Sequence, residues 1–147
     1  LGVLGEAGKL DADEALAVAQ RVITRANGKP VIVGVSAPGF AAMRSLAHAV
    51  MDRGAAGVMI APSAAARTDD QIAGYFRGAV EAVGADVPWV LQDFPQVTGV
   101  VMAPAVIARI VRENPSLMVL KHEDWAGLEK ISGTSERDAG SDREPAS

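Results

Sequence analysis

The sequence contains no cysteine, which excludes a disulfide framework and any metal site built from thiolates. This absence is typical of proteins kept in a reducing compartment, and we expect a cytoplasmic location. A basic excess is missing too. The 14 Lys and Arg against 18 Asp and Glu give a net charge of -4, whereas nucleic-acid binding needs a basic face. No apolar run approaches the roughly 20 residues that span a bilayer, so we expect neither a nucleic-acid nor a membrane partner.

Hydrophobic residues are frequent from the start of the sequence to about residue 132. Hydrophobic residues make up 49% of the 147 residues, which is enough for the core of one domain. Residues 133–147 are polar, with alanine as their only aliphatic type, and Leu1 opens inside an apolar segment without an initiating methionine. We therefore expect a folded domain over residues 1–132, a disordered polar tail over residues 133–147, and a chain cut from something longer.

Apolar, β-branched runs alternate with amphipathic helical patterns at intervals of roughly 25–30 residues, the rhythm of βαβ units. Runs that are apolar throughout indicate strands covered on both faces of a parallel sheet. Two architectures fit, a doubly wound sheet and a (β/α)8 barrel, and both place chemistry beyond the carboxyl ends of the strands. The predicted strands are 30–35, 57–60, 87–91 and 117–120, and the predicted helices are 11–27, 40–53, 68–83, 104–114 and 125–131.

Lys121 is the most informative single residue. It ends the apolar run 118–120, which is predicted to be a buried strand. An ammonium there is costly to desolvate unless it is paired or its pKa falls, and a lysine with a lowered pKa attacks carbonyl groups to form a Schiff base. The residues alone equally allow a structural lysine paired with Glu6 or Asp93.

Other candidate motifs are weaker. Gly8-Lys9 is not a phosphate-binding P-loop, because Leu10 stands where a Ser or Thr must bind magnesium. His122, Glu123 and Asp124 carry metal-ligating groups, but adjacent residues on a strand point to opposite faces, so we expect no metal site. The Gly2–Glu6 segment allows a close backbone approach to a ligand, or forms a plain strand-to-helix turn.

Two spaced motifs and the lysine together resemble one family. Gly5-Glu6, Leu10 and Glu14 match the signature Gly-Glu-x-x-x-Leu-x-x-x-Glu of the dihydrodipicolinate synthase / N-acetylneuraminate lyase family, with Gly2 as its leading glycine. These proteins are class I, Schiff-base aldolases. The order and spacing of the motifs agree over about residues 2–131, which identifies the chain as a divergent and truncated member.

The later part of the resemblance carries the chemistry. Pro95 and Thr98-Gly99 match the family motif that usually reads Tyr-Asn-x-Pro-x-x-Thr-Gly, and Lys121 matches the Schiff-base lysine on the sixth strand. The resemblance therefore implies a partial (β/α)8 TIM barrel that runs from roughly the end of strand 2 to strand 6. It also implies a lyase or aldolase that acts on pyruvate or another 2-oxo acid, needs no cofactor and forms a homo-oligomer.

The resemblance also assigns roles to residues. Lys121 is expected to be the nucleophile, with Gln92 and Asp93 lining the pocket opposite it where the family usually has tyrosine and asparagine. Asp93 or His122 is expected to act as the acid–base group in place of that tyrosine. The substrate-binding set is expected to be Gly2, Gly5, Glu6, Thr98 and Gly99.

Departures from the family pattern favour an alternative. Val3-Leu4 replace a threonine pair, Ser63-Ala64 replace a tyrosine pair, and Val97 replaces an arginine that often binds a distal carboxylate. With these groups changed and strands absent, the chain is alternatively a non-catalytic fragment of a barrel, with open edges and no activity of its own.

Overall fold

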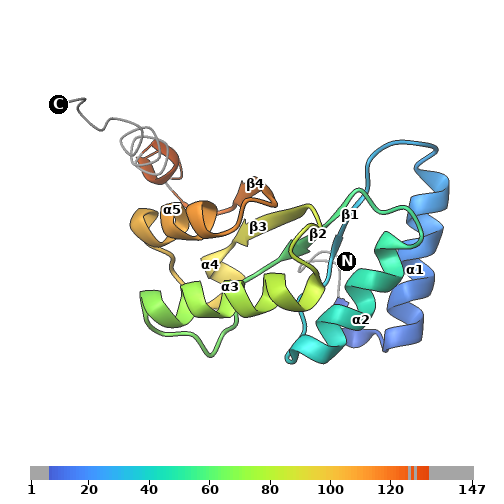
Figure 1. Ribbon diagram of the computed structural model, residues 1–147, viewed down its shortest axis with the longest axis horizontal. Coiled ribbons are helices and arrows are strands. Elements are labelled where there is room, and N and C mark those ends of the chain that lie inside the picture. The colour runs from blue at the N-terminus through green and yellow to red at the C-terminus, as the bar shows by residue number, and fades with distance from the viewer. Residues whose placement is uncertain (1–6, 126, 128, 133–147) are drawn as a thin grey trace.

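The computed structural model describes residues 7–125, 127 and 129–132 (Figure 1). It contains a sheet of four parallel strands that neighbour one another in chain order. A doubly wound sheet reverses its strand order and carries helices on both faces, so this order favours the barrel. The strands are β1 (Ile32–Gly34), β2 (Gly57–Ile60), β3 (Trp89–Asp93) and β4 (Leu117–His122).

Each long helix follows or precedes a strand, and two of them begin at a capping box. The Asp11 carboxylate accepts the Glu14 backbone N–H at 2.8 Å while the Glu14 side chain accepts the Asp11 N–H at 3.1 Å. Thr68 and Gln71 make the same exchange further along. These bonds satisfy N–H groups that have no partner within the helix. The helices are α1 (Ala12–Arg25), α2 (Phe40–Met51), α3 (Asp69–Val83), α4 (Pro95–Thr98) and α5 (Pro104–Glu113), preceded by the 3-10 turn η1 (Ala7–Lys9).

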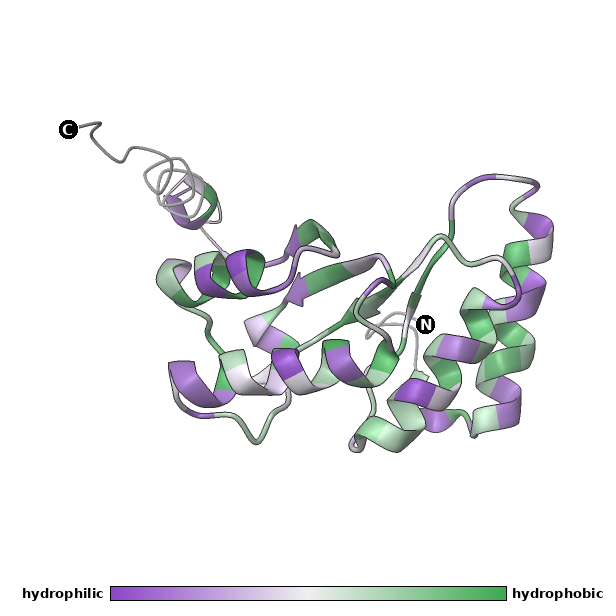
Figure 2. Ribbon diagram, viewed as in Figure 1, coloured by the Kyte–Doolittle hydropathy of each residue, from purple (hydrophilic) through white to green (hydrophobic). Residues whose placement is uncertain are grey.

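The long helices cover one face of the sheet. They lie in the order α1, α2, α3, α5 beside the strands (Figure 1). Figure 2 shows mainly hydrophobic residues along the strands and hydrophobic residues alternating with hydrophilic ones along the helices. In that layer the ring of Phe76 from α3 stacks on Trp89 of β3, with ring centroids 5.7 Å apart. Val58, Ile60 and Leu91 are buried in the same cluster. One layer of helices outside a parallel sheet is the arrangement of a partial (β/α)8 barrel, as expected.

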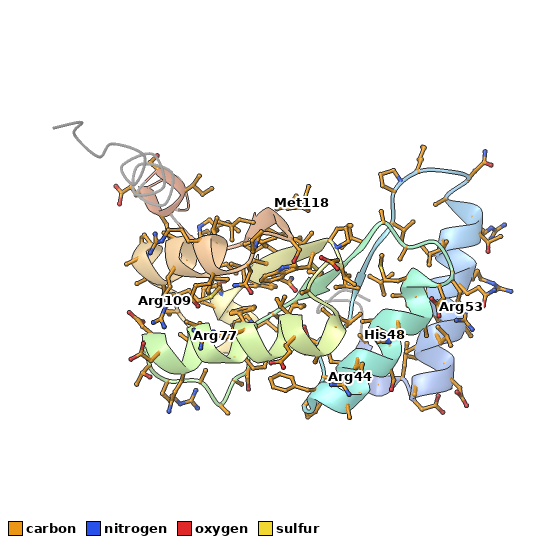
Figure 3. All side chains as sticks on the ribbon, viewed as in Figure 1. Arg44, His48, Arg53, Arg77, Arg109 and Met118 are labelled. Atoms are coloured by element: carbon orange, nitrogen blue, oxygen red, sulfur yellow. The ribbon has the colours of Figure 1, made fainter. Side chains whose placement is uncertain are left out.

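The last strand departs from the sequence prediction. Residues 118–120 were expected to form a strand covered on both faces, yet Met118 is 68% and Val119 is 53% exposed. Figure 3 shows Met118 pointing away from the helices. The expectation was wrong because, among the described residues, β4 lies at the edge of the sheet and no element covers its second face. The open edge and exposed apolar face expected of a partial barrel are confirmed.

The predicted element boundaries held with local exceptions. Strand β1 occupies only three residues of the predicted run 30–35, and β3 begins and ends two residues later than the predicted run 87–91. Strand β4 continues beyond its predicted end, so that Lys121 lies within the strand. Helix α4 was not predicted. Residues 127 and 129–132 are helical, as expected for 125–131, while residues 133–147 lie outside the described residues.

Candidate active site

The predicted catalytic residues lie at the carboxyl ends of β3 and β4. The two parallel strands pair Gln92 with Lys121 and Asp93 with His122, after a register irregularity at Trp89/Val90. Because neighbouring strands keep their pleats in phase, each pair shares one face of the sheet. Gln92 and Lys121 point away from the helices, and Asp93 and His122 point to the helix-covered face.

On the face away from the helices, Lys121 and Gln92 meet at the carboxylate of Glu123. Lys121 Nζ lies 2.7 Å from Glu123 Oε1, and Gln92 Nε2 donates to the same oxygen at 2.8 Å. The Glu123 backbone N–H donates to the Asp93 carbonyl at 2.8 Å, which extends the strand pairing one residue past β4. Glu123 therefore follows Lys121 by two residues on an extended backbone and shares its face.

Burial differs across this group. Gln92 is buried, the Glu123 side chain is 25% exposed and the Lys121 side chain is 48% exposed. The expected desolvation of Lys121 is therefore not seen, because no described element covers β4 on that side. Burial raises the pKa of the Glu123 carboxyl, but the hydrogen bonds from Lys121 and Gln92 and the lysine charge outweigh it, so the pKa falls below its ordinary value.

Asp93 lies on the opposite face, which corrects the expectation that it lines a pocket with Lys121. Its carboxylate is fully buried, and Oδ2 lies 2.7 Å from His122 Nδ1 and 2.8 Å from Lys130 Nζ. The alternation of side chains along β3 causes the separation, because Gln92 and Asp93 are neighbours in sequence. His122 is held there with Asp93, so the structure does not bring either expected acid–base group to the lysine.

A shallow hollow adjoins Glu123. It has a volume of about 370 Å³ and opens at the ends of β3 and β4. This is the end of the strands where (β/α)8 enzymes bind their substrates. The hollow is lined by Phe94, Gln96, Glu123, Asp124 and Trp125.

The other predicted site residues are either local supports or not described. The Thr98 hydroxyl donates to the Phe94 carbonyl at 3.1 Å and accepts the Val100 N–H at 3.2 Å. Gly99 ends α4 with a φ of 68°, in the left-handed region that favours glycine. The predicted binding residues Gly2, Gly5 and Glu6 lie outside the described residues.

The sequence reasoning missed Glu123 as a partner of the lysine. It weighed this residue only as a metal ligand beside His122 and Asp124. The spacing of two between Lys121 and Glu123 on a strand was the available signal, because it places both side chains on one face. Within the part of the chain that the structure describes, no three His, Asp or Glu side chains come together as a metal site would require.

The fold and the lysine at a strand end define a protein of the (β/α)8-barrel class. The family model for the dihydrodipicolinate synthetase family matches residues 1–134, and the chain belongs to this family. Over the described residues, each helix is too short or too polar to cross a membrane.

Individual relatives agree with the family match. The chain is 34% identical over 133 residues to a 4-hydroxy-tetrahydrodipicolinate synthase of Pelobacter propionicus, covering 89% of this chain and 44% of the relative. The crystal structure of dihydrodipicolinate synthase from Rhodopseudomonas palustris matches with a TM-score of 0.92 and 60% identity, over 100% of this chain and 49% of that one. The chain thus spans about half the length of these relatives.

A third match includes a bound small molecule. The chloride inhibited dihydrodipicolinate synthase from Acinetobacter baumannii, solved in complex with pyruvate, is 25% identical to this chain, with a TM-score of 0.81. The match covers 95% of this chain and 47% of that structure. Because these matches cover nearly the whole of this chain, they establish the partial barrel fold.

Proposed function

We propose that the chain acts as a lyase or aldolase on pyruvate or another 2-oxo acid through a Schiff base at Lys121. The observation that carries this proposal is the Lys121 amine, which lies at the carboxyl end of β4, half exposed and beside Gln92 and Glu123. Membership of the dihydrodipicolinate synthetase family supports the reaction class. The pyruvate complex of the Acinetobacter baumannii relative supports the substrate class.

In the proposed reaction the neutral amine of Lys121 attacks the keto carbon of the 2-oxo acid. The resulting carbinolamine loses water to give a protonated imine. The imine accepts an electron pair from the adjacent carbon, so that a carbon–carbon bond breaks or forms, or water is eliminated. The lysine itself supplies the electron sink that a cofactor supplies in other enzymes.

The proposal extends to substrate binding. Backbone N–H groups of the turn at Gly2 and Gly5 would bind the substrate carboxylate, and Glu6 would brace that turn. Thr98 and Gly99 complete the substrate-binding set. Gln92 contributes by orienting the carboxylate of Glu123, to which its amide donates. Asp93 contributes from the opposite face, where it anchors His122.

Borohydride trapping tests the proposal. The chain is incubated with pyruvate and a panel of 2-oxo acids, reduced, and analysed by intact mass, with Lys121→Ala as the variant and Lys29→Ala as the matched exposed control. We expect the mass of one reduced imine in the wild type and in Lys29→Ala, and none in Lys121→Ala. An unmodified wild-type chain that remains folded would contradict the proposal.

One observation favours the alternative of a fragment without activity of its own. Met118 and Val119 leave an apolar face exposed on the strand that carries the lysine. The same trapping experiment separates the two functions, because only the enzyme forms the adduct. The cytoplasmic location and the homo-oligomer stay predictions.

A further inference from the structure

We propose that Glu123 is the group that moves protons to and from Lys121. This assignment rests on the proposed Schiff-base function and deepens it, because that reaction requires an acid–base group beside the amine. The residues expected from the sequence to fill this role, Asp93 and His122, are buried on the opposite face of the sheet. Glu123 takes their place by geometry.

The contact with Lys121 meets the first requirement of a general base. Glu123 Oε1 lies 2.7 Å from Lys121 Nζ, within hydrogen-bond reach of the proton to be removed. The bond from Gln92 converges on the same oxygen, so Oε2 is not needed to hold the lysine. Glu123 is also one of the residues that line the hollow at the strand ends, so the residue that contacts the amine adjoins a space open to a small acid.

The surroundings keep this carboxyl group ionised at neutral pH. Hydrogen bonds from Lys121 and Gln92 oppose the effect of burial and lower its pKa. The ionised form accepts a proton, and the protonated form donates it readily, because a lowered pKa makes a carboxyl group the stronger acid and the weaker base. The two states suit the two halves of imine formation.

The proton transfers balance over the cycle. Glu123 first takes a proton from the Lys121 ammonium, and the freed lone pair attacks the keto carbon. The new nitrogen–carbon bond forms as the carbonyl π bond breaks, and one proton passes from nitrogen to the alkoxide through the carboxyl group. Glu123 then protonates the hydroxyl, which leaves as water while the nitrogen lone pair forms the imine. The carboxylate ends as it began, and both protons lost from nitrogen leave in the water.

Gln92 is the positioning residue in this arrangement. It is buried, pairs in register with Lys121 and donates its amide to the catalytic carboxylate rather than to the substrate. Because Gln92 is buried and paired within the sheet, its amide holds Glu123 Oε1 beside the amine. A catalytic side chain needs such a hydrogen bond from a neighbouring residue to stay in its productive position.

The test is the rate of imine trapping in single-turnover reactions with pyruvate. Glu123→Gln keeps the size of the side chain and removes its acid–base function, and Glu81→Gln is the matched control on the exposed side of α3. General acid–base catalysis contributes about 100-fold or more, so we expect Glu123→Gln to trap at least about 100-fold more slowly and Glu81→Gln to trap like the wild type. Circular dichroism verifies that each variant is folded.

A second variant provides an independent test in case Glu123→Gln does not fold. Glu123→Ala leaves room for formate, which we expect to raise the trapping rate in proportion to its concentration and to leave the wild type unchanged. Equal rates in the wild type and folded Glu123→Gln, or no effect of formate on folded Glu123→Ala, would overturn the role of Glu123 but leave the proposed function standing. A wild-type chain that traps no pyruvate would instead overturn the proposed function.

Discussion

At the residue scale, the group around Lys121 shows what a sequence can and cannot reveal. The lysine was found from its place after an apolar run, and Gln92 from its place on the preceding strand. Glu123 was missed because it was considered only as a metal ligand, although its spacing of two from Lys121 places both side chains on one face of a strand. The register of β3 against β4 decides that Gln92, and not Asp93, pairs with Lys121, and register follows from pairing between strands rather than from one strand's own residues.

The lowered pKa of Glu123 predicts a pH dependence of stability. A carboxyl group whose pKa is lower in the folded state stabilises that state above its unfolded pKa of about 4.3, and the contribution disappears as the pH falls through the folded pKa. We expect Glu123→Gln to lower the free energy of unfolding at pH near 7 and to lose most of that effect in acid. Urea unfolding at both pH values measures it. Glu81→Gln should show no such pH dependence, and an effect of Glu123→Gln that is the same at both pH values would contradict the argument.

The buried cluster at Asp93 predicts a large loss of stability. Asp93→Ala removes the carboxylate that contacts both His122 and Lys130, whose side chains are mostly buried. Breaking a buried pair in this way costs roughly 3–5 kcal/mol, whereas the exposed Asp86→Ala should change stability by less than about 0.5 kcal/mol. Urea unfolding compares the two variants. A similar small effect for both would show that the cluster does not stabilise the fold.

At the element scale, the starts of several helices could be predicted from local capping residues and from proline. The capping boxes at Asp11 and Thr68 and the proline at the start of α5 mark helix starts that the structure confirms. Strand ends were harder to predict because they depend on a neighbour. Strand β4 continues to His122 since β3 provides partners for it as far as Asp93. Helix α4 is a single turn, too short for a periodic pattern to show.

Close packing between strands predicts opposite effects for two glycines. A Cβ on Gly57 of β2 would lie 2.6 Å from the Pro88 carbonyl oxygen, so Gly57→Ala must push β2 and β3 apart. We expect it to cost about 1–3 kcal/mol. Gly74 in the middle of α3 has nothing within 4 Å of such a Cβ, and Gly74→Ala should stabilise by roughly 0.5–1 kcal/mol. Thermal unfolding of both variants measures the effects, and a stabilising Gly57→Ala would contradict the strand spacing.

At the scale of the whole molecule, the alternation of strands and helices predicted the parallel sheet. The sequence could not decide between a doubly wound sheet and a barrel from periodicity, because both have the same local rhythm. The family motifs decided it, and the strand order agrees. The exposure of Met118 and Val119 was not predicted from the apolar run, since a run shows that a strand is apolar and not what covers it.

The open face of β4 predicts concentration-dependent association. An exposed apolar edge strand pairs with other chains unless charge blocks it. We expect Met118→Lys and Val119→Lys to reduce association in sedimentation-velocity experiments, measured over a range of protein concentrations. Val101→Lys, at an equally exposed apolar residue outside the sheet, is the control and should change little. Equal association in all variants would show that the chains do not associate through β4.

The central claim is that Lys121 is a reactive amine at the end of a barrel strand. Its most direct test is to locate the trapped adduct by peptide mass spectrometry after treatment with pyruvate and borohydride. The chain has four lysines, Lys9, Lys29, Lys121 and Lys130. Our account predicts the reduced adduct on Lys121 alone. A modification spread over all four lysines, or found on the others while Lys121 stays unmodified, would contradict it.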